Sequence, residues 1–288
     1  MSFLSAVMLH THASWLDFLY LAMVNRVPKE KVSLVEFGEE LLKLEDLDPV
    51  YPVLRPYAIA DRERARRAIL AYALFYDIGE ALYLASQADF WPAIRIAAVN
   101  EEATPHGTRW PRAAERRHFR GKKCVEAVDE LARAFPAPEG LVERLVEPGG
   151  ELKEVITRLS ILPQFGPWIA FKLCDIGERV LEAPIVFPQE LNGTLYISPL
   201  FTVRALAEAE SVHPKVIWDR ALEHFSQFSA PPRHERGCGA QEIETIFCKY
   251  GSYLKGHYYV GKDVKEVSHS LKLWAYPASR IGGDGEGK

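Results

Sequence analysis

Cysteine is scarce in this sequence, with four residues among 288. No two of them have the C-x-x-C spacing that commonly begins a structural zinc site or a four-cysteine iron–sulfur loop. We therefore expect no metal ion and no other cofactor. Unpaired thiols are typical of proteins in a reducing compartment, so the sequence predicts a cytoplasmic protein.

Long apolar runs are also missing. No stretch reaches the roughly 18 uninterrupted apolar residues that a membrane-spanning helix needs. The N-terminal segment is apolar, but no basic region precedes it, and His10, His12 and Asp17 interrupt it. This pattern argues against a secretory signal, and we expect no membrane partner.

An overall positive charge, which would favour nucleic-acid binding, is absent, because 35 Lys and Arg face 39 Asp and Glu. Any such surface must therefore be local. The segment 109–123 has this character: seven basic residues face a single acid, Glu115. Its basic residues are Arg109, Arg112, Arg116, Arg117, Arg120, Lys122 and Lys123. Trp110 and Phe119 are interleaved, which favours phosphate binding over an ordinary solvated face.

Strand patterns are nearly absent, and only 183–198 has extended character. Helical periodicity covers 14–26, 33–44, 61–88, 123–135, 199–210, 213–227 and 240–253. Prolines predict irregular connections at 46–57 and 136–150. We therefore expect an all-α fold with one helical domain over 1–278, either single or as two lobes around a cleft. The segment 1–60 should pack on the rest, and 279–288 should be a disordered tail.

The segment 151–182 predicts two helices joined by a tight hairpin at 162–166. Pro163 should end the first helix, because proline cannot continue it. Gly166 should provide a positive φ for the reversal, and Pro167 suits the first position of the second helix. Free N–H groups at such a helix start can bind phosphate.

Four functional side chains share one face of the second helix, at the spacing of successive turns. They are Trp168, Lys172, Asp175 and Arg179. An ion-paired, solvated stripe is one interpretation. Because the helix is otherwise apolar, burial is expected, and buried charges are costly unless they are paired or used. We favour a functional cleft.

Two further places concentrate polar groups. Asp77 and Glu80 lie within the apolar half of the helix expected at 61–88. They mark either a helix end that emerges into water or the lining of a site. The loop 255–263 is aromatic, polar and glycine-rich, and Lys249 and Cys248 precede it. Cys248 is more simply explained as a structural thiol than as a nucleophile.

The hairpin resembles the helix-hairpin-helix motif of DNA glycosylases, which usually reads Leu-Pro-Gly-aliphatic-Gly. Leu162, Pro163 and Gly166 match, whereas Gln164 and Phe165 depart from it; an ordinary αα-hairpin is the alternative. The resemblance implies a glycosylase-like helical architecture. It also implies contacts to the DNA backbone from Gln164, Gly166, Lys122 and Lys123.

The same resemblance reveals a missing group. Some of these glycosylases carry a lysine at the position of Trp168, and a catalytic aspartate near the position of Val186. Neither is present, and no carboxylate lies at 185–188. Cleavage of an N-glycosidic bond needs such a group, so ordinary base excision is not favoured.

A closer resemblance is carried by motifs at 76–79, 115–121, 165–172 and 259–263, together with Asp175, Arg179 and the pair Cys248-Lys249. The combination resembles the amino acid:DNA transferases of bacteriophages, also described as α-glutamyl/putrescinyl-thymine pyrophosphorylases. The resemblance implies thymidine hypermodification, in which a free amino acid displaces phosphate from 5-phosphomethyl-deoxyuridine in double-stranded DNA. It further implies base flipping and action in the host cytoplasm.

The resemblance and this chemistry together suggest roles. The catalytic candidates are Lys172, Asp175, Arg117, His118 and Asp77. The candidates for substrate or phosphate binding are Arg116, Arg120, Arg179, Trp168, Lys249 and Tyr258. Asp175, or failing that Asp77, would take the amine proton, and Lys172 or Arg179 would hold the amino-acid carboxylate. A base-excision glycosylase and a non-catalytic DNA-binding protein are the alternatives.

Overall fold

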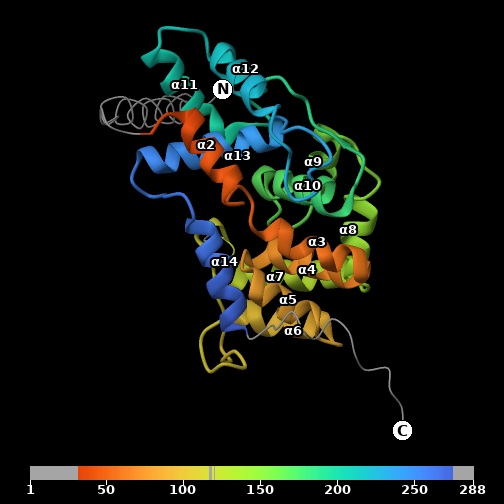
Figure 1. Ribbon diagram of the computed structural model, residues 1–288. Helices are drawn as coiled ribbons and strands as arrows, with labels where there is room; N and C mark the ends of the chain where they lie inside the picture. The colour runs from red at the N-terminus through yellow and green to blue at the C-terminus, as the bar shows by residue number, and fades with distance from the viewer. Residues whose placement is uncertain (1–31, 117–118, 120, 275–288) are drawn as a thin grey trace, which may run out of the picture. The chain divides into compact units, whose positions relative to one another are not determined.

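A computed structural model describes residues 32–116, 119 and 121–274 of the chain (Figure 1). In this part, thirteen α-helices are accompanied by one short 3-10 helix and two strands of two residues each. The all-α prediction is therefore confirmed. The helix expected at 14–26 and the tail expected at 279–288 lie outside the described residues. None of the described helices is both long and apolar enough to cross a membrane.

The chain divides into two compact units. Among the described residues, the first unit comprises 32–47 and 188–262, and the second comprises 48–116, 119, 121–187 and 263–274. Of the segment 1–60, residues 32–47 thus lie in the first unit and residues 48–60 in the second. The sequence did not predict the helix α14 (Lys262–Leu273). It begins at Lys262, the last residue of the first unit, and continues in the second unit.

The first unit is built around one central helix. Its helices are α2 (Leu34–Lys43), α11 (Ile197–Ala209), α12 (Pro214–Phe225) and α13 (Ala240–Leu254), and α13 contacts the other three. Trp218 stacks between Tyr196 and Phe247 in its core. Ser33 and Glu36 form a capping box at the start of α2, which explains why the sequence places this helix correctly.

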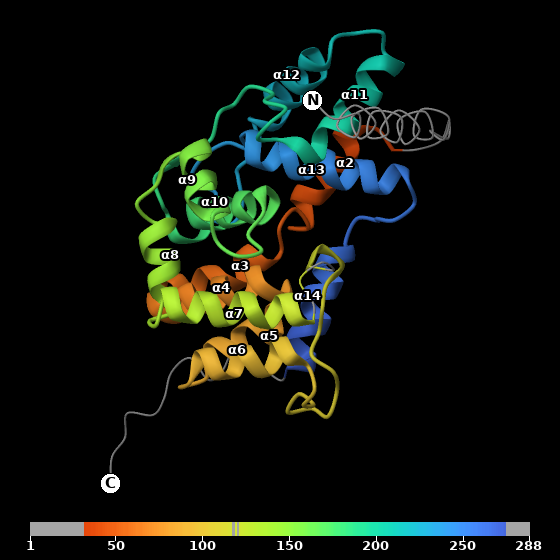
Figure 2. The same cartoon turned by 180° about the vertical axis from the view of Figure 1, so that it is seen from behind.

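The second unit holds the hairpin and is centred on α4. Its helices are α3 (Val50–Ala60), α4 (Arg62–Phe75), α5 (Ile78–Ala85), α6 (Phe90–Val99), α7 (Lys122–Ala134), α8 (Glu139–Leu145), α9 (Leu152–Ser160) and α10 (Pro167–Leu181). Alanines 65, 68, 71 and 73 of α4 are buried, and their small side chains let α3, α5, α8 and α10 approach. Figure 2 shows α6 and α7 running alongside one another.

The prediction of an irregular connection at 46–57 was wrong, because α3 begins at Val50. Pro49 is its N-cap residue and Pro52 lies in its first turn, where backbone N–H groups have no partner within the helix. Only Pro56 removes an internal hydrogen bond. Burial of Tyr51, among other side chains, stabilises the helix against that loss.

The prediction of one continuous helix over 61–88 was also wrong. Tyr76 adopts a left-handed conformation (φ 61°) and ends α4, and Asp77 then caps α5. The Asp77 carboxylate accepts hydrogen bonds from the Glu80 amide at 2.8 Å and from the Ser270 hydroxyl at 2.7 Å. A residue other than glycine rarely occupies this conformation, so the apolar pattern alone concealed the break. Likewise, the short helix α8 lies in the predicted connection 136–150.

The two strands, β1 (Gly150–Glu151) and β2 (Ile185–Val186), pair in parallel with Gly150 opposite Ile185. Gly149 precedes β1 with a φ of +68°, and a Cβ there would lie 2.3 Å from the Pro184 carbonyl oxygen. We expect Gly149→Ala to lower the free energy of unfolding by about 3 kcal/mol, through left-handed strain and a backbone clash. Denaturant unfolding followed by circular dichroism measures this change.

The matched control is Gly166→Ala, because a Cβ at Gly166 meets no atom within 4 Å and its φ is −68°. We expect its stability to stay within about 0.5 kcal/mol of the wild type. Equal stability of the Gly149→Ala protein and the wild type would contradict the close approach of residues 149 and 184.

Candidate active site

The predicted hairpin is present, with α9 ending at Ser160 and α10 beginning at Pro167. The residue with the left-handed backbone is Gln164 (φ 63°), not Gly166 as we expected. The departure from the glycine-rich motif thus falls at the one position where the reversal requires a positive φ. Gln164 and Gly166 are both exposed, and no side chain caps the start of α10. These features suit contact with a phosphate.

Arg116 ties this hairpin to the end of α4. Its guanidinium donates to the Leu74 carbonyl at 3.1 Å and to the Gln164 carbonyl at 3.3 Å, and it lies over the ring of Phe119. The side chain is buried, and burial lowers its pKa to about 10. Because both contacts are to backbone oxygens, the geometry favours support of the hairpin over the phosphate binding expected from the sequence.

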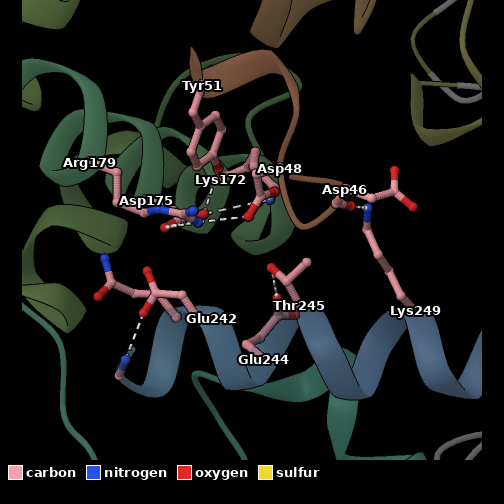
Figure 3. A network of polar contacts seen from close by, with 12 residues as sticks. Asp46, Asp48, Tyr51, Lys172, Asp175, Arg179, Glu242, Glu244, Thr245 and Lys249 are labelled. Atoms are coloured by element: carbon pink, nitrogen blue, oxygen red, sulfur yellow. Dashed lines mark hydrogen bonds and ion pairs between the residues drawn. The ribbon is translucent and has the colours of Figure 1, made fainter. Parts of the chain in front are cut away.

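The charged face of α10 is the centre of a buried ion cluster in the second unit (Figure 3). Lys172 Nζ lies 3.0 Å from Asp48 Oδ1, and Arg179 Nη1 lies 2.6 Å from Asp48 Oδ2. Asp175 lies 3.6 Å from each of the two cations. Two carboxylates and two cations therefore alternate around the cluster. The Asp175 side chain is fully buried and that of Arg179 is 2% exposed, so solvent screens these charges only weakly.

Tyr51 completes the cluster. Its hydroxyl donates a hydrogen bond of 2.5 Å to Asp175 Oδ2, and its ring lies against Arg179 and Lys172. Burial raises the pKa of Asp175, and the Asp48 carboxylate raises it further, while Arg179 and Lys172 act in the opposite direction. Burial and the carboxylates of Asp175 and Asp48 keep the pKa of Tyr51 well above its usual value, so its hydroxyl stays a donor. A carboxylate with a raised pKa is a stronger proton acceptor.

The sequence predicted three of these five residues. The helical spacing of Lys172, Asp175 and Arg179 placed them on one face, and their burial is as expected. The sequence analysis missed Asp48 and Tyr51, which lie in a proline-rich segment without helical periodicity. The only signal in the sequence was their spacing of three residues around a proline. In the structure this spacing forms a turn, in which the Tyr51 amide donates to the Asp48 carbonyl.

An aromatic row adjoins the cluster. The Tyr72 and Tyr76 rings stack at 4.6 Å between centroids, and Trp168 packs against Tyr76 at 5.3 Å. Burial raises the pKa of Tyr72, and the Asp48 carboxylate raises it too, while the charge of Lys172 acts in the opposite direction. Tyr76 and Trp168 are half-buried and so keep part of each ring accessible. Such rings can stack on a nucleobase.

Two other predicted residues meet in the first unit. Lys249 Nζ lies 2.9 Å from the Tyr258 hydroxyl. It also contacts the Asp46 carbonyl oxygen (Figure 3). Asp46, which the sequence did not single out, accepts from the Tyr258 hydroxyl at 2.7 Å and from the Gly261 amide at 2.5 Å. Asp46 is fully buried, so these bonds fix the end of the 255–261 loop.

Three of the remaining predicted residues, Arg117, His118 and Arg120, lie outside the described residues, so their expected roles in catalysis and phosphate binding stay predictions. Lys122 and Lys123 are exposed at the start of α7. Cations at a helix N-terminus are repelled by the positive end of the helix dipole. An anion bound there would be attracted by both the lysines and the dipole. Asp77 serves as the cap of α5, as described above.

The second unit thus offers a buried proton acceptor, two cations beside it and partly accessible aromatic rings. No carboxylate lies at the position where glycosylases carry their catalytic aspartate, since both residues of β2, Ile185 and Val186, are apolar. Among the described residues, no three His, Cys, Asp or Glu side chains are placed to hold a metal ion. All four cysteines are free thiols. The arrangement can deprotonate an amine and bind a carboxylate.

Comparison with known proteins gives three findings. Residues 59–259 match the model of a family described as amino acid:DNA transferase. A glycinyltransferase of Pseudomonas phage PaMx11 is 36% identical over 270 residues, which cover 85% of this chain and 92% of that protein. A putrescinyltransferase of Delftia phage PhiW-14 is 27% identical over 257 residues, or 84% of this chain and 78% of that protein. Lys172, Asp175 and Arg179 lie within the matched family segment, and Asp48 and Tyr51 precede it.

Proposed function

The chain belongs to the amino acid:DNA transferase family, and on that basis we propose that it acts on 5-phosphomethyl-deoxyuridine in double-stranded DNA. The amine nitrogen of a free amino acid forms a bond to the 5-methylene carbon. The bond from that carbon to the phosphate oxygen breaks, and phosphate leaves with the electron pair. The two similar proteins named above come from phages, so the reaction belongs in the cytoplasm of an infected cell.

Asp175 is the proton acceptor in this proposal. An ammonium group cannot attack, so the incoming amine must lose one proton, which passes to the Asp175 carboxylate. The hydrogen bond from Tyr51 fixes that carboxylate, and burial raises its pKa. Lys172 and Arg179 lie beside it and hold the carboxylate of the amino acid.

The groups that hold the DNA are ones that the sequence suggested, with Tyr76 added from the structure. Tyr76 and Trp168 stack on the flipped pyrimidine. The exposed residues Gln164 and Gly166, with Lys122 and Lys123, contact the DNA backbone. From the sequence alone, Arg117, His118 and Arg120 supply positive charge to the leaving phosphate, with Lys249 and Tyr258 as further substrate-binding candidates.

The single observation behind this proposal is the buried pairing of Asp175 with Lys172 and Arg179 in a chain of this family. The test incubates the protein with duplex DNA containing phosphomethyl-uracil and a mixture of amino acids. The DNA is then digested to nucleosides and analysed by mass spectrometry. We expect an aminoacyl-methyl deoxyuridine, together with one inorganic phosphate for each nucleoside formed.

Two other outcomes would contradict the proposal. Abasic sites without the new nucleoside would identify a base-excision glycosylase. Salt-sensitive binding of DNA without any product would identify a DNA-binding protein only. Unphosphorylated hydroxymethyl-uracil DNA is the matched substrate control, because it lacks the leaving group and should give no product.

A further inference from the structure

We infer that Ser270 of α14 is a positioning residue, which acts through Asp77 and the start of α5 to hold the ring of Tyr76 where a flipped pyrimidine stacks on it. This inference rests on the proposed function. It deepens that function by giving α14, a helix that the sequence did not predict, a role in holding the target base. It also gives Asp77 a task other than proton transfer.

The first support is the bonding between α14 and the start of α5, two parts of the second unit. The Ser270 hydroxyl donates to Asp77 Oδ1 at 2.7 Å and accepts from the Gly79 amide at 2.8 Å. Ser270 is buried, so water competes little for these two bonds. One hydroxyl thus joins α14 both to the capping residue of α5 and to its first turn.

The second support is the close approach of the two helices at Gly79. A Cβ on Gly79 would lie 2.6 Å from the Ser270 carbonyl oxygen and 2.4 Å from Cδ1 of Trp274. Only glycine therefore lets α14 lie this near to α5. Trp274 is itself buried, with its ring against those of Tyr83 and Trp110. The contact is thus a packed part of the second unit.

Tyr76 is the residue that this contact controls. It directly precedes Asp77 and has a left-handed backbone (φ 61°), and its amide donates to the Tyr72 carbonyl at 2.7 Å. A residue other than glycine keeps such a conformation only where its surroundings fix it. The Tyr72 carbonyl and ring act from the side of α4, and Asp77 acts from the side of α5. Without the Ser270 hydroxyl, Asp77 would still cap α5, but the start of α5 would lose its bonds to α14.

The position of the Tyr76 ring matters because stacking requires close contact between two planes. The ring is half-buried, with Tyr72 at 4.6 Å and Trp168 at 5.3 Å between centroids. A displacement of about 1 Å can reduce a rate about 100-fold when it misplaces the reacting group. A loosened start of α5 therefore lowers the population of the flipped, stacked base. The bonds of Asp175 come from other elements, so binding of the amino acid should not change.

The test compares Ser270→Ala with the wild type on duplex DNA that carries phosphomethyl-uracil beside 2-aminopurine. The fluorescence of 2-aminopurine rises when its neighbour leaves the stack. We expect this rise to be about 10-fold smaller in the variant. The single-turnover rate constant of transfer should fall by the same factor, because transfer begins from the flipped state. The KM for the amino acid that the wild type uses should stay unchanged.

Two further comparisons accompany this variant. Ser268→Ala is the matched control, because it removes the same group two residues earlier on α14, where the side chain points in nearly the opposite direction. It should behave as the wild type. Asp77→Ala should reproduce the defect of Ser270→Ala. Asp77→Asn should recover most of the fluorescence rise, because its amide oxygen can accept the same two hydrogen bonds.

A role in folding alone would lower the amplitude of the single turnover, which reports the amount of active enzyme. The rate constant and the fluorescence rise for each active enzyme would then equal those of the wild type, and that result would overturn the inference. A KM for the amino acid that rose as much as flipping fell would overturn it too, since the whole site would then be loosened. Both results would leave the proposed function intact, whereas no product from the wild type would overturn both.

Discussion

Replacing Asp175 by asparagine is expected to reduce the rate of amino-acid transfer about 1,000-fold, because the amide cannot accept the amine proton. Asparagine has nearly the same shape and can accept the hydrogen bond from Tyr51 that the carboxylate accepts. The measurement is single-turnover formation of the modified nucleoside at saturating amino acid. DNA affinity, measured by fluorescence anisotropy, should remain close to that of the wild type.

Two variants with the same chemical change accompany this experiment. Asp129→Asn alters an exposed ion pair with Arg95 and should retain wild-type transfer. Asp77→Asn distinguishes the two aspartates that the sequence offered as bases. Asparagine caps a helix about as well as aspartate, so α5 should persist. If Asp77→Asn abolished transfer and Asp175→Asn did not, the base would be Asp77.

Replacing Lys172 by methionine is expected to move the acid limb of the pH–rate profile to higher pH. The positive charge of Lys172 lowers the pKa of Asp175, so its removal raises that pKa. The base acts only when deprotonated, and therefore activity below the raised pKa is lost. The KM for the amino acid should also rise, by about 10- to 100-fold, since one cation for its carboxylate is gone. A pH series of kcat/KM measures both effects.

The matched variant is Lys122→Met, which removes an exposed lysine at the start of α7. This variant should bind DNA more weakly, and its DNA affinity should depend less steeply on salt concentration. Its pH–rate profile should stay that of the wild type. An unchanged pH profile for Lys172→Met would contradict the coupling of Lys172 to Asp175. A thermal melt checks that both proteins are folded, because removing one partner from a buried ion pair can cost about 3–5 kcal/mol.

Much of the site could be predicted from the sequence because helices repeat. The spacing of Lys172, Asp175 and Arg179 follows the helical turn, and the apolar residues between them indicate burial. The scattered motifs were also sufficient for the family, and the match over residues 59–259 confirms that resemblance. Local chemistry likewise located α2, whose capping box and periodicity agree. Amphipathic periodicity alone located α7, whose start has no side-chain cap.

The wrong predictions, at the segment 46–57, at Tyr76 and at Gln164, have a common cause: the backbone there departs from local residue preference. Prolines at 49, 52 and 56 read as a connection, yet two of them fall where a helix tolerates proline. Tyr76 and Gln164 adopt left-handed conformations that residues other than glycine rarely enter, and neither could be foreseen from residue type. Contacts with residues distant in the sequence accompany each exception: Tyr51 of α3 is buried, Tyr76 packs against Trp168, and the Gln164 carbonyl accepts a hydrogen bond from Arg116.

The sequence by itself determined the all-α class, the hairpin between α9 and α10, and the charged face of α10, because these depend on neighbours within a few turns of one chain segment. Only the tertiary structure decided that Asp48 and Tyr51 join that face, since 124 positions separate Tyr51 from Asp175. It also decided that Arg116 supports the hairpin instead of facing solvent. Burial and pairing of charge arise when distant segments pack together, and no local pattern specifies which distant partner a buried charge will meet.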